Sequence, residues 1–357
     1  MQHLHAEKLN QIVVKILTNA GSNSKEAEIV ASHLVQSNLL GHDSHGVGMV
    51  PIYVSNISDG SLIPNQHVVK VREDMAMQVF DGQRGYGQCI ASEVMQSAIA
   101  NCRQNGLTVA ALRNVHHVGR VGAYGEQSLA AGLISIHFVN VVGYGRIAPH
   151  GGRDGRLGTN PMCIAIPGTK ETEPILLDMA SSKLPVGKVR VALEAGVSVG
   201  DDNLLDADGN PTNDPHTIYN EPPGALLPVG SYKGYGIALC CEVLAGALCG
   251  GGTVQNRDGK TGGVINNMLT FLVDPERLVD LDWMHREIDA IVRHVKASPP
   301  VDPKEPVRIA GDPERETWKQ RKAEGIPLSS GSWQALCKAA EKVGVPTREI
   351  EAIRHED

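Results

Sequence analysis

The sequence lacks the features that direct a chain to membranes or to nucleic acids. No uninterrupted apolar run reaches the ~18 residues that a membrane span needs. The start, MQHLHAEKLN, has neither the basic region nor the apolar stretch of a secretion signal. The net charge of -7 includes no basic cluster, which disfavours nucleic acids and anionic membrane surfaces as partners. We therefore expect a cytoplasmic protein with no nucleic-acid or membrane partner.

Motifs that bind metals are missing as well. The seven cysteines are an odd number and show no CxxC spacing, so we expect reduced residues of the core. No HExxH pattern occurs, and the only HxH pattern is His3-Leu4-His5 at the terminus. The sequence therefore predicts no metal site.

A dinucleotide-binding fingerprint of the GxGxxG type is absent. The nearest pattern, Gly119-Arg-Val-Gly122-Ala-Tyr-Gly125, lies between a predicted strand and a predicted helix, but its glycine spacing differs. Close packing alone also explains glycine at these positions. A conventional Rossmann domain is therefore disfavoured.

The first part of the chain is helical. Its 357 residues, 41% hydrophobic and 20% charged, are typical of a soluble enzyme with two or three subdomains. One helix face is predicted by Leu9, Ile12, Val13, Ile16 and Leu17. Asn23 and Glu26 form a capping pair for a second helix, which Gly41 ends. Alternating residues from Val68 to Val79 then predict a hairpin.

A βαβ-like pattern follows the hairpin. Residues 107–112 and 133–141 predict buried strands, and residues 121–131 predict the helix between them. Ligands of α/β sheets bind beyond the carboxyl ends of strands, where His116, His117 and Arg120 would lie. This loop is a candidate site, although two polar loop histidines without a task fit the same pattern.

The segment Gly41-His-Asp-Ser-His-Gly46 places two histidines, a carboxylate and a hydroxyl at a break after the second helix. Histidine moves protons near neutral pH, and flanking glycines let the backbone approach a ligand. Two interpretations remain open. The segment is catalytic, or Asp43 or Ser44 caps the next helix and His45 is a surface residue.

Two further segments have the composition of nucleotide-binding loops. Residues 151–161 are too rich in glycine for a regular element, and residues 175–182 predict a strand that ends in Asp178 and small polar residues. Exposed backbone N–H groups and hydroxyls suit phosphates and ribose, but such loops are also common without a ligand.

Seven segments together resemble the type 2 malate/L-lactate dehydrogenase family, in order and over nearly the whole chain: GHDSHGVGMVPIY, NVHHVGRVGAYGEQ, GTNPMCIAIP, LLDMASS, GKVRVALEAGVSV, DADGNPTNDP and YKGYGIALCCEVLAGALCGG. The resemblance implies an NAD(P)-dependent oxidoreductase that interconverts 2-oxo and 2-hydroxy acids, with NAD(H) favoured over NADP(H). It also implies a homodimer whose subunits share parts of the active site.

The same resemblance implies an α/β fold with a non-Rossmann mixed sheet, of the malate/L-lactate (L-sulfolactate) dehydrogenase type, and helical N- and C-terminal segments. We expect a helical segment 1–70 that packs with a helical segment 305–357. An α/β domain would combine residues 71–145 with 270–304, and residues 146–269 would form the cofactor-binding region.

Site residues follow from the family's motifs. The resemblance implies that His45 is the proton donor, His117 the second active-site histidine and Asp178 the aspartate after the central strand. Ser44 joins them as a catalytic candidate. The cofactor would contact Gly119, Arg120, Val121, Leu177, Asp178, Met179, Ala180, Ser181, Lys233, Gly234, Asn266, Ile309, Ala310, Gly311 and Asp312.

One departure from the family's pattern concerns the substrate. Many members have arginine where this chain has Met49, and an arginine fork suits a carboxylate. We expect Arg120 to supply that charge or to contact the cofactor pyrophosphate. We also expect Met49 to favour 2-oxo acids with larger or apolar side chains over oxaloacetate. The alternatives are a cyclic imine or diketo-acid reductase on this scaffold, a non-catalytic nucleotide-binding protein and a metal hydrolase.

Overall fold

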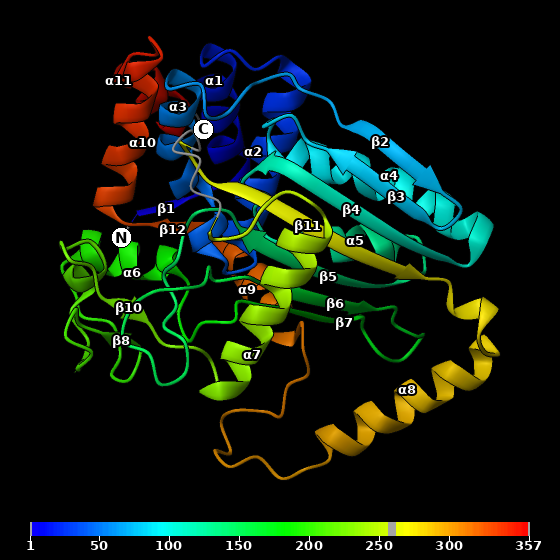
Figure 1. The fold of residues 1–357 in the computed structure, drawn as a ribbon. Coiled ribbons are helices and arrows are strands. Elements are labelled where there is room, and N and C mark those ends of the chain that lie inside the picture. The colour runs from blue at the N-terminus through cyan, green and yellow to red at the C-terminus, as the bar shows by residue number, and fades with distance from the viewer. Residues whose placement is uncertain (1, 256–261, 356–357) are drawn as a thin grey trace.

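A seven-stranded mixed sheet forms the centre of the molecule (Figure 1). The computed structural model describes residues 2–255 and 262–355. Residues 1, 256–261 and 356–357 belong to the segments 1–70, 146–269 and 305–357 predicted from the sequence, and they lie outside the described residues. The sheet order is β2-β3-β4-β11-β5-β6-β7. Its strands are Val69–Asp74 (β2), Met77–Asp81 (β3), Leu107–His116 (β4), Ile134–Val141 (β5), Met162–Ile166 (β6), Ile175–Met179 (β7) and Ile265–Val273 (β11).

Pairing within this sheet confirms the predicted mixed α/β fold. β3 and β4 are parallel, whereas the other neighbouring strands are antiparallel. β11 lies between β4 and β5, so these two strands are not neighbours as a simple βαβ unit would require. β4 also continues to His116, which pairs with Ile265, so His116 belongs to the strand and not to the predicted loop.

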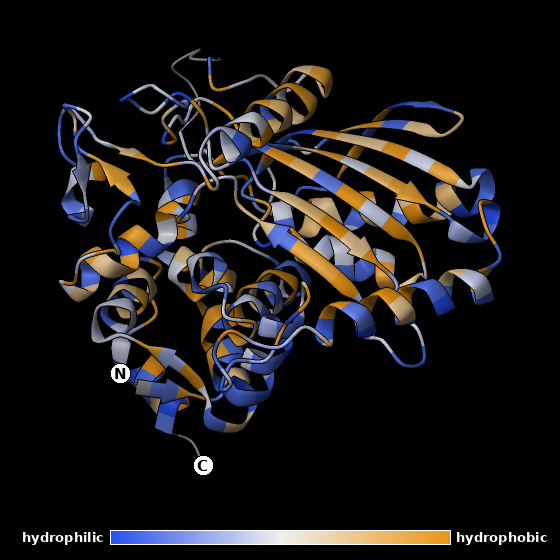
Figure 2. Ribbon diagram, turned by 90° about the horizontal axis from the view of Figure 1, so that it is seen from below, coloured by the Kyte–Doolittle hydropathy of each residue, from blue (hydrophilic) through white to orange (hydrophobic). Residues whose placement is uncertain are grey.

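Helices cover both faces of the sheet. α4 (Gly87–Asn105) and α5 (Gly122–Ala130) pack on one face, where Ala110 and Leu112 of β4 join their core. α7 (Tyr232–Cys241) and its π-helical continuation, Glu242–Leu248, lie on the other face. Ala111 joins a small core there, as the alternation of side chains in a strand requires. Figure 2 shows the resulting hydrophobic character of the strands.

The N-terminal helices pack with the C-terminal ones. One hydrophobic core contains residues from both ends of the chain. Its helices are α1 (Ala6–Asn19), α2 (Ser24–Leu39), α3 (Val50–Ser58), α10 (Ser330–Lys342) and α11 (Thr347–His355), and β1 (Gln2–Leu4) pairs with β12 (Ile326–Leu328). The predicted buried face of α1 is confirmed, and the Asn23 side chain accepts a hydrogen bond from the backbone N–H of Glu26.

A third core surrounds α6 (Val186–Ala195) and a small sheet of Leu204–Leu205 (β8), Pro211–Thr212 (β9) and Ala225–Leu226 (β10). The chain then runs through α8 (Leu281–Lys296) and α9 (Asp312–Glu324). All seven cysteines are free; six are buried, but Cys240 is exposed on α7, so the prediction of core cysteines is wrong for this residue. Within the described ranges, no helix is long and apolar enough to cross a membrane.

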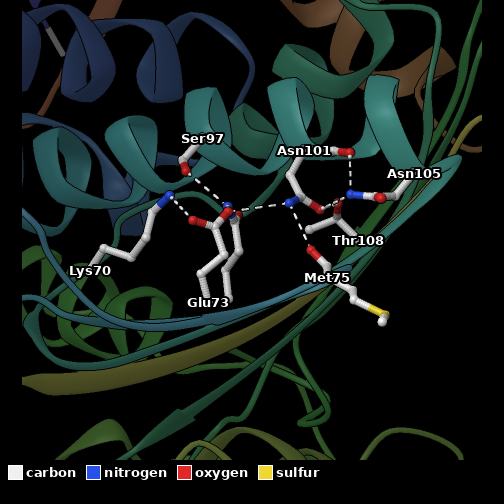
Figure 3. A network of polar contacts seen from close by, with 8 residues as sticks. Lys70, Glu73, Met75, Ser97, Asn101, Asn105 and Thr108 are labelled. Atoms are coloured by element: carbon white, nitrogen blue, oxygen red, sulfur yellow. Dashed lines mark hydrogen bonds and ion pairs between the residues drawn. The ribbon is translucent and has the colours of Figure 1, made fainter.

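The predicted hairpin is confirmed as β2 and β3, and polar contacts fasten it to α4 (Figure 3). Glu73 accepts hydrogen bonds from Lys70 and Gln78, at 2.8 and 2.7 Å. Asn101 of α4 donates to the backbone oxygen of Met75 at 2.9 Å. Because β2 is exposed along its whole length, these polar contacts hold the edge of the sheet where apolar burial does not.

Candidate active site

The segment after α2 folds back on that helix through Asn38. The amide nitrogen of Asn38 donates to Asp43 at 2.6 Å, and its oxygen accepts from the backbone N–H of Val47 at 2.9 Å. A Cβ on Gly46 would lie 2.2 Å from the same oxygen, so only glycine permits this approach. Gly41 has φ +85°, which lets the chain reverse after α2. His45 is held by these contacts in the short 3₁₀ turn Asp43–His45.

Asp43 anchors the segment to α9. Its carboxylate pairs with the Arg321 guanidinium through two contacts of 2.7 and 3.0 Å. Neither Asp43 nor Ser44 caps a helix, because the cap positions of the two 3₁₀ turns and of α3 are His42, Gly46 and Met49. The capping interpretation of this segment is therefore wrong.

The rings of His45 and His117 lie next to each other, although 72 residues separate them in sequence. Their rings are nearly parallel, at 9°, with centroids 5.3 Å apart. His45 Nδ1 lies 3.3 Å from His117 Nε2. His117 Nδ1 lies 2.7 Å from the hydroxyl of Tyr53, which in turn lies 2.7 Å from the amide nitrogen of Gln88 on α4.

This chain of contacts has one consistent direction of donation. The Gln88 amide nitrogen can only donate, so the Tyr53 oxygen accepts and its O–H donates to His117 Nδ1. Neutral His117 then carries its proton on Nε2 and donates to His45 Nδ1. Neutral His45 consequently carries its own proton on Nε2, a nitrogen without a hydrogen-bond partner among the described residues.

Burial keeps these histidines uncharged. It is the main cause that lowers the pKa of His45 to about 4, and the positive charges of His42, Arg120 and Arg190 lower it further. Burial, followed by His45, lowers the pKa of His117 well below its ordinary value. Both imidazoles are therefore neutral near pH 7 while the site holds no anion.

Arg120 and Asp178 lie beside the first turn of α5. Asp178 accepts a hydrogen bond from the backbone N–H of Gly122 at 2.7 Å, and burial raises the pKa of its carboxyl. Arg120 is buried, its Nη2 lies 2.6 Å from the Glu126 carboxylate, and its backbone N–H donates to His33 on α2. No hydrogen bond joins Asp178 to a histidine in the part of the chain that the structure describes.

The segments predicted to hold the cofactor lie next to one another. Besides the bond between Gly122 and Asp178, four backbone N–H groups connect them: Val118 to Asn266 Oδ1, Leu176 to the Ala310 oxygen, Val229 to the Ser181 oxygen and Gly234 to the Val229 oxygen. Lys233 is exposed at the start of α7. Asp312 begins α9 and pairs with Lys296 and Arg315.

Met49 and Ser44, two of the predicted site residues, are both buried, and packing determines their positions. Met49 is 7% exposed and belongs to the N-terminal hydrophobic core, so the prediction that it borders the substrate stays untested. Ser44 is buried, and a Cβ on Gly187 of α6 would lie 2.5 Å from its Cβ. α6 therefore packs directly on the turn that carries His45.

Sequence reasoning missed four residues of this region. Tyr53 and Arg190 lie within two of the segments that resemble the family, yet nothing in their local sequence pattern indicated a role. Gln88 and His33 lie on helices whose patterns indicated packing only. Each of the four is placed by contacts between distant segments, which no local signal reveals.

The donor set fits an organic cofactor better than a metal. Within residues 2–255 and 262–355, no three histidine, cysteine, aspartate or glutamate side chains lie close enough to hold an ion. Arg120 Nε is buried without a partner among the described residues. An open cavity of about 390 Å³ between α2, α4 and α5 is bordered by His33, Gln88 and Arg120, but not by His45, His117 or Asp178. Orphaned polar atoms of this kind suit a polar ligand.

Comparisons with known proteins agree with this arrangement. The family model for malate/L-lactate dehydrogenase matches residues 4–337. Hydroxycarboxylate dehydrogenase B of Escherichia coli K12 is 42% identical over 350 residues, which cover 98% of this chain and 96% of the relative. L-lactate dehydrogenase of Cupriavidus necator is 38% identical, covering 90% and 93% of the two chains.

A solved structure gives the same answer. An E. coli protein described as a malate/lactate dehydrogenase has a TM-score of 0.94 and 41% identity, and the match covers 99% of this chain and 98% of that one. The chain therefore belongs to the malate/L-lactate dehydrogenase family and is an oxidoreductase of the 2-hydroxy acid dehydrogenase class.

Proposed function

We propose that the protein transfers a hydride between a nicotinamide cofactor and a 2-oxo acid/2-hydroxy acid pair, with NAD(H) used in preference to NADP(H). The observation that carries this proposal is the directed chain from Gln88 through Tyr53 and His117 to His45. It leaves one N–H of His45 available to a carbonyl oxygen. Two of the segments proposed to hold the cofactor meet where Gly122 donates to Asp178, and the charge of Arg120 in the same loop acts on His45.

Reduction needs one hydride and one proton. A bound reduced nicotinamide supplies the hydride to the carbonyl carbon. Protonated His45 donates its Nε2 proton to the carbonyl oxygen as negative charge develops there, so His45 becomes neutral and the products are the 2-hydroxy acid and the oxidised cofactor. Protonated His45 also carries a proton on Nδ1, which faces His117 Nε2. In that state His45 donates and His117 Nε2 accepts, so the proton of His117 lies on Nδ1, toward the Tyr53 oxygen. In the reverse reaction, neutral His45 with its proton on Nδ1 accepts the substrate proton on Nε2.

The substrate's own charge makes this proton available. Burial is the main cause that lowers the pKa of His45 in the empty site, and nearby cations lower it further. A bound carboxylate opposes their field, and a nearby anion favours the protonated form of an imidazole, so the pKa of His45 rises when substrate binds. The protonated donor therefore forms mainly in the substrate complex.

Chemistry also suggests how the cofactor is held. The Lys233 ammonium suits a phosphate, and the Asp178 carboxylate and Asn266 amide suit hydroxyl or carboxamide groups. The backbone segments Gly119 to Val121, Leu177 to Ser181 and Ile309 to Asp312 would complete the site. Ser44 stands next to His45, and its hydroxyl would contact the reacting substrate.

A homodimer in the cytoplasm is part of the proposal. α7 and its continuation expose Tyr232, Leu239, Val243 and Leu248. Exposed apolar side chains gathered along one element support an interface with a second copy. That interface would bring a partner subunit close to Lys233.

The test is an assay of purified protein with NADH or NADPH against a panel of 2-oxo acids and cyclic imines. We expect cofactor oxidation with 2-oxo acids, a lower KM for NADH than for NADPH, and full activity after treatment with EDTA. Turnover of cyclic imines alone would place the chain among imine reductases. A loss of activity that zinc restores would contradict the metal-free mechanism.

A further inference from the structure

Arg190 points a guanidinium at the turn that carries His45. It lies on α6, one helical turn after Gly187, so both residues share the helix face that packs on Ser44. A Cβ on Gly48 would lie 3.0 Å from Arg190 Nη2. The tip of the side chain thus reaches the residue before Met49, and its charge acts on His45, His117 and Tyr53.

The guanidinium of Arg190 is poorly satisfied. Its side chain is 20% exposed, and its closest anion is Glu194 Oε1, 3.7 Å from Nε. That distance is too long for a hydrogen bond, and Nε is buried without a partner among the described residues. A largely buried cation in this state favours the binding of an anion.

Arg120 also has a buried Nε without a partner among the described residues, but it differs from Arg190 in its anionic neighbours. Its Nη2 lies 2.6 Å from Glu126, and Asp178 lies close enough for the two charges to interact. Two carboxylates already balance its charge. Arg190 is therefore the cation near His45 that has no carboxylate within hydrogen-bond distance.

We infer that Arg190 binds the carboxylate of the 2-oxo acid and thereby sets the substrate's orientation toward His45. This inference rests on the proposed function. Many family members have a positively charged arginine at the position of Met49. In this chain Arg190 would supply that positive charge, because its side chain reaches from α6 to the same turn. One fork binds one carboxylate bidentately, so the site recognises monocarboxylic 2-oxo acids.

The test compares a 2-oxo acid with its uncharged amide, pyruvate with pyruvamide, in wild type and variants. Arg190→Met removes the charge and keeps a chain of similar reach. A charge-assisted hydrogen bond contributes about 1.5–3 kcal/mol, which corresponds to roughly 10- to 150-fold in affinity. We expect KM for pyruvate to rise by about this factor, KM for NADH to stay within about twofold, and the preference for pyruvate over pyruvamide to disappear.

Controls separate this role from a structural one. Arg348→Met, the same substitution at an exposed position of α11, should leave the preference for pyruvate unchanged. Arg190→Lys keeps the charge without the fork and should retain the preference with an intermediate KM, even if Arg190→Met folds poorly.

Three outcomes would decide the matter against the proposals. An unchanged preference for pyruvate in Arg190→Met would overturn the role of Arg190. Loss of that preference in Arg120→Met instead would assign the carboxylate to Arg120. If none of the 2-oxo acids supported NADH oxidation by the wild type, the proposed function itself would fail.

Discussion

Two polar networks in this molecule differ in how their charges are balanced. Around Glu73, the donors Lys70, Gln78, Asn101, Asn105 and Thr108 each reach an acceptor. The hydrogen bond from Lys70 is the main cause that holds the pKa of Glu73 below its usual range. Around His45, burial is the main cause that lowers the pKa of the imidazole to about 4, and the charges of Arg120 and Arg190 lower it further.

The difference separates structure from chemistry. The network of Glu73 fastens β2 and β3 to α4, and its carboxylate is paired with Lys70 and Gln78 (Figure 3). The His45 region holds neutral, buried titratable groups in a positive field, a state that an anion relieves. Strongly perturbed groups of this kind are typical of functional sites.

The largest expected effect comes from the proton donor. His45→Gln should lower kcat by about 100- to 10,000-fold, because general acid catalysis contributes that much. NADH affinity, measured by its fluorescence, should persist. The matched control is His67→Gln in the hairpin region, where His67 pairs with Glu93 at the surface; this variant should keep full kcat. Near-normal kcat in His45→Gln would remove His45 from the mechanism.

Asp178→Asn should have the next largest effect. Asparagine keeps the shape and still accepts from Gly122, but it leaves Arg120 with less compensation. The stronger positive field lowers the pKa of His45, so 2-oxo acid reduction should fall off at a lower pH than in wild type. We expect a rate about 10-fold lower at pH 8, equivalent to one pKa unit. Identical pH profiles would reassign Asp178 to structure.

A smaller effect is expected from Tyr53→Phe. The variant removes the donor to His117 Nδ1 and leaves Gln88 without its acceptor. Loss of a hydrogen bond of about 1 kcal/mol corresponds to roughly a fivefold lower kcat, with KM for NADH unchanged. Double-mutant analysis with His45→Gln tests the relay. If the two effects on kcat were additive, Tyr53 would act independently of His45.

The hairpin network should affect stability and not catalysis. Asn101→Ala leaves Thr108 and the Met75 oxygen without partners, so we expect the free energy of unfolding to fall by about 1–3 kcal/mol. Thermal unfolding and steady-state kinetics measure the two properties on the same sample. A reduced kcat with unchanged stability would show that this network is not purely structural.

Local patterns predicted local structure well. The buried face of α1 and the cap at Asn23 follow from neighbours within a few residues, and both are present. The position of β11 between β4 and β5 is different, because that strand comes from more than 120 residues beyond β5 and pairs by long-range hydrogen bonds. A strand that is buried on both faces has the same apolar sequence pattern whichever strand lies beside it. The sequences of β4 and β5 therefore do not reveal that β11 lies between them.

The site shows the same limit. Sequence motifs indicated His45, His117 and Asp178, because the residue type alone shows that these side chains can exchange protons. Arg190 acquires its position only because Gly187 lets α6 touch Ser44. Met49, in contrast, lies among apolar residues, a placement that follows from the packing of α3 and not from its own chemistry.

The pH dependence of oxamate binding to the NADH complex tests the central claim most directly. Oxamate is an unreactive analogue of a 2-oxo acid, and its carboxylate should raise the pKa of His45 from about 4. Affinity should then fall about tenfold per pH unit between that pKa and the raised value in the complex. Calorimetry in buffers of different ionisation enthalpy should show uptake of close to one proton, which His45→Gln abolishes. Affinity independent of pH, with no proton taken up, would contradict the account.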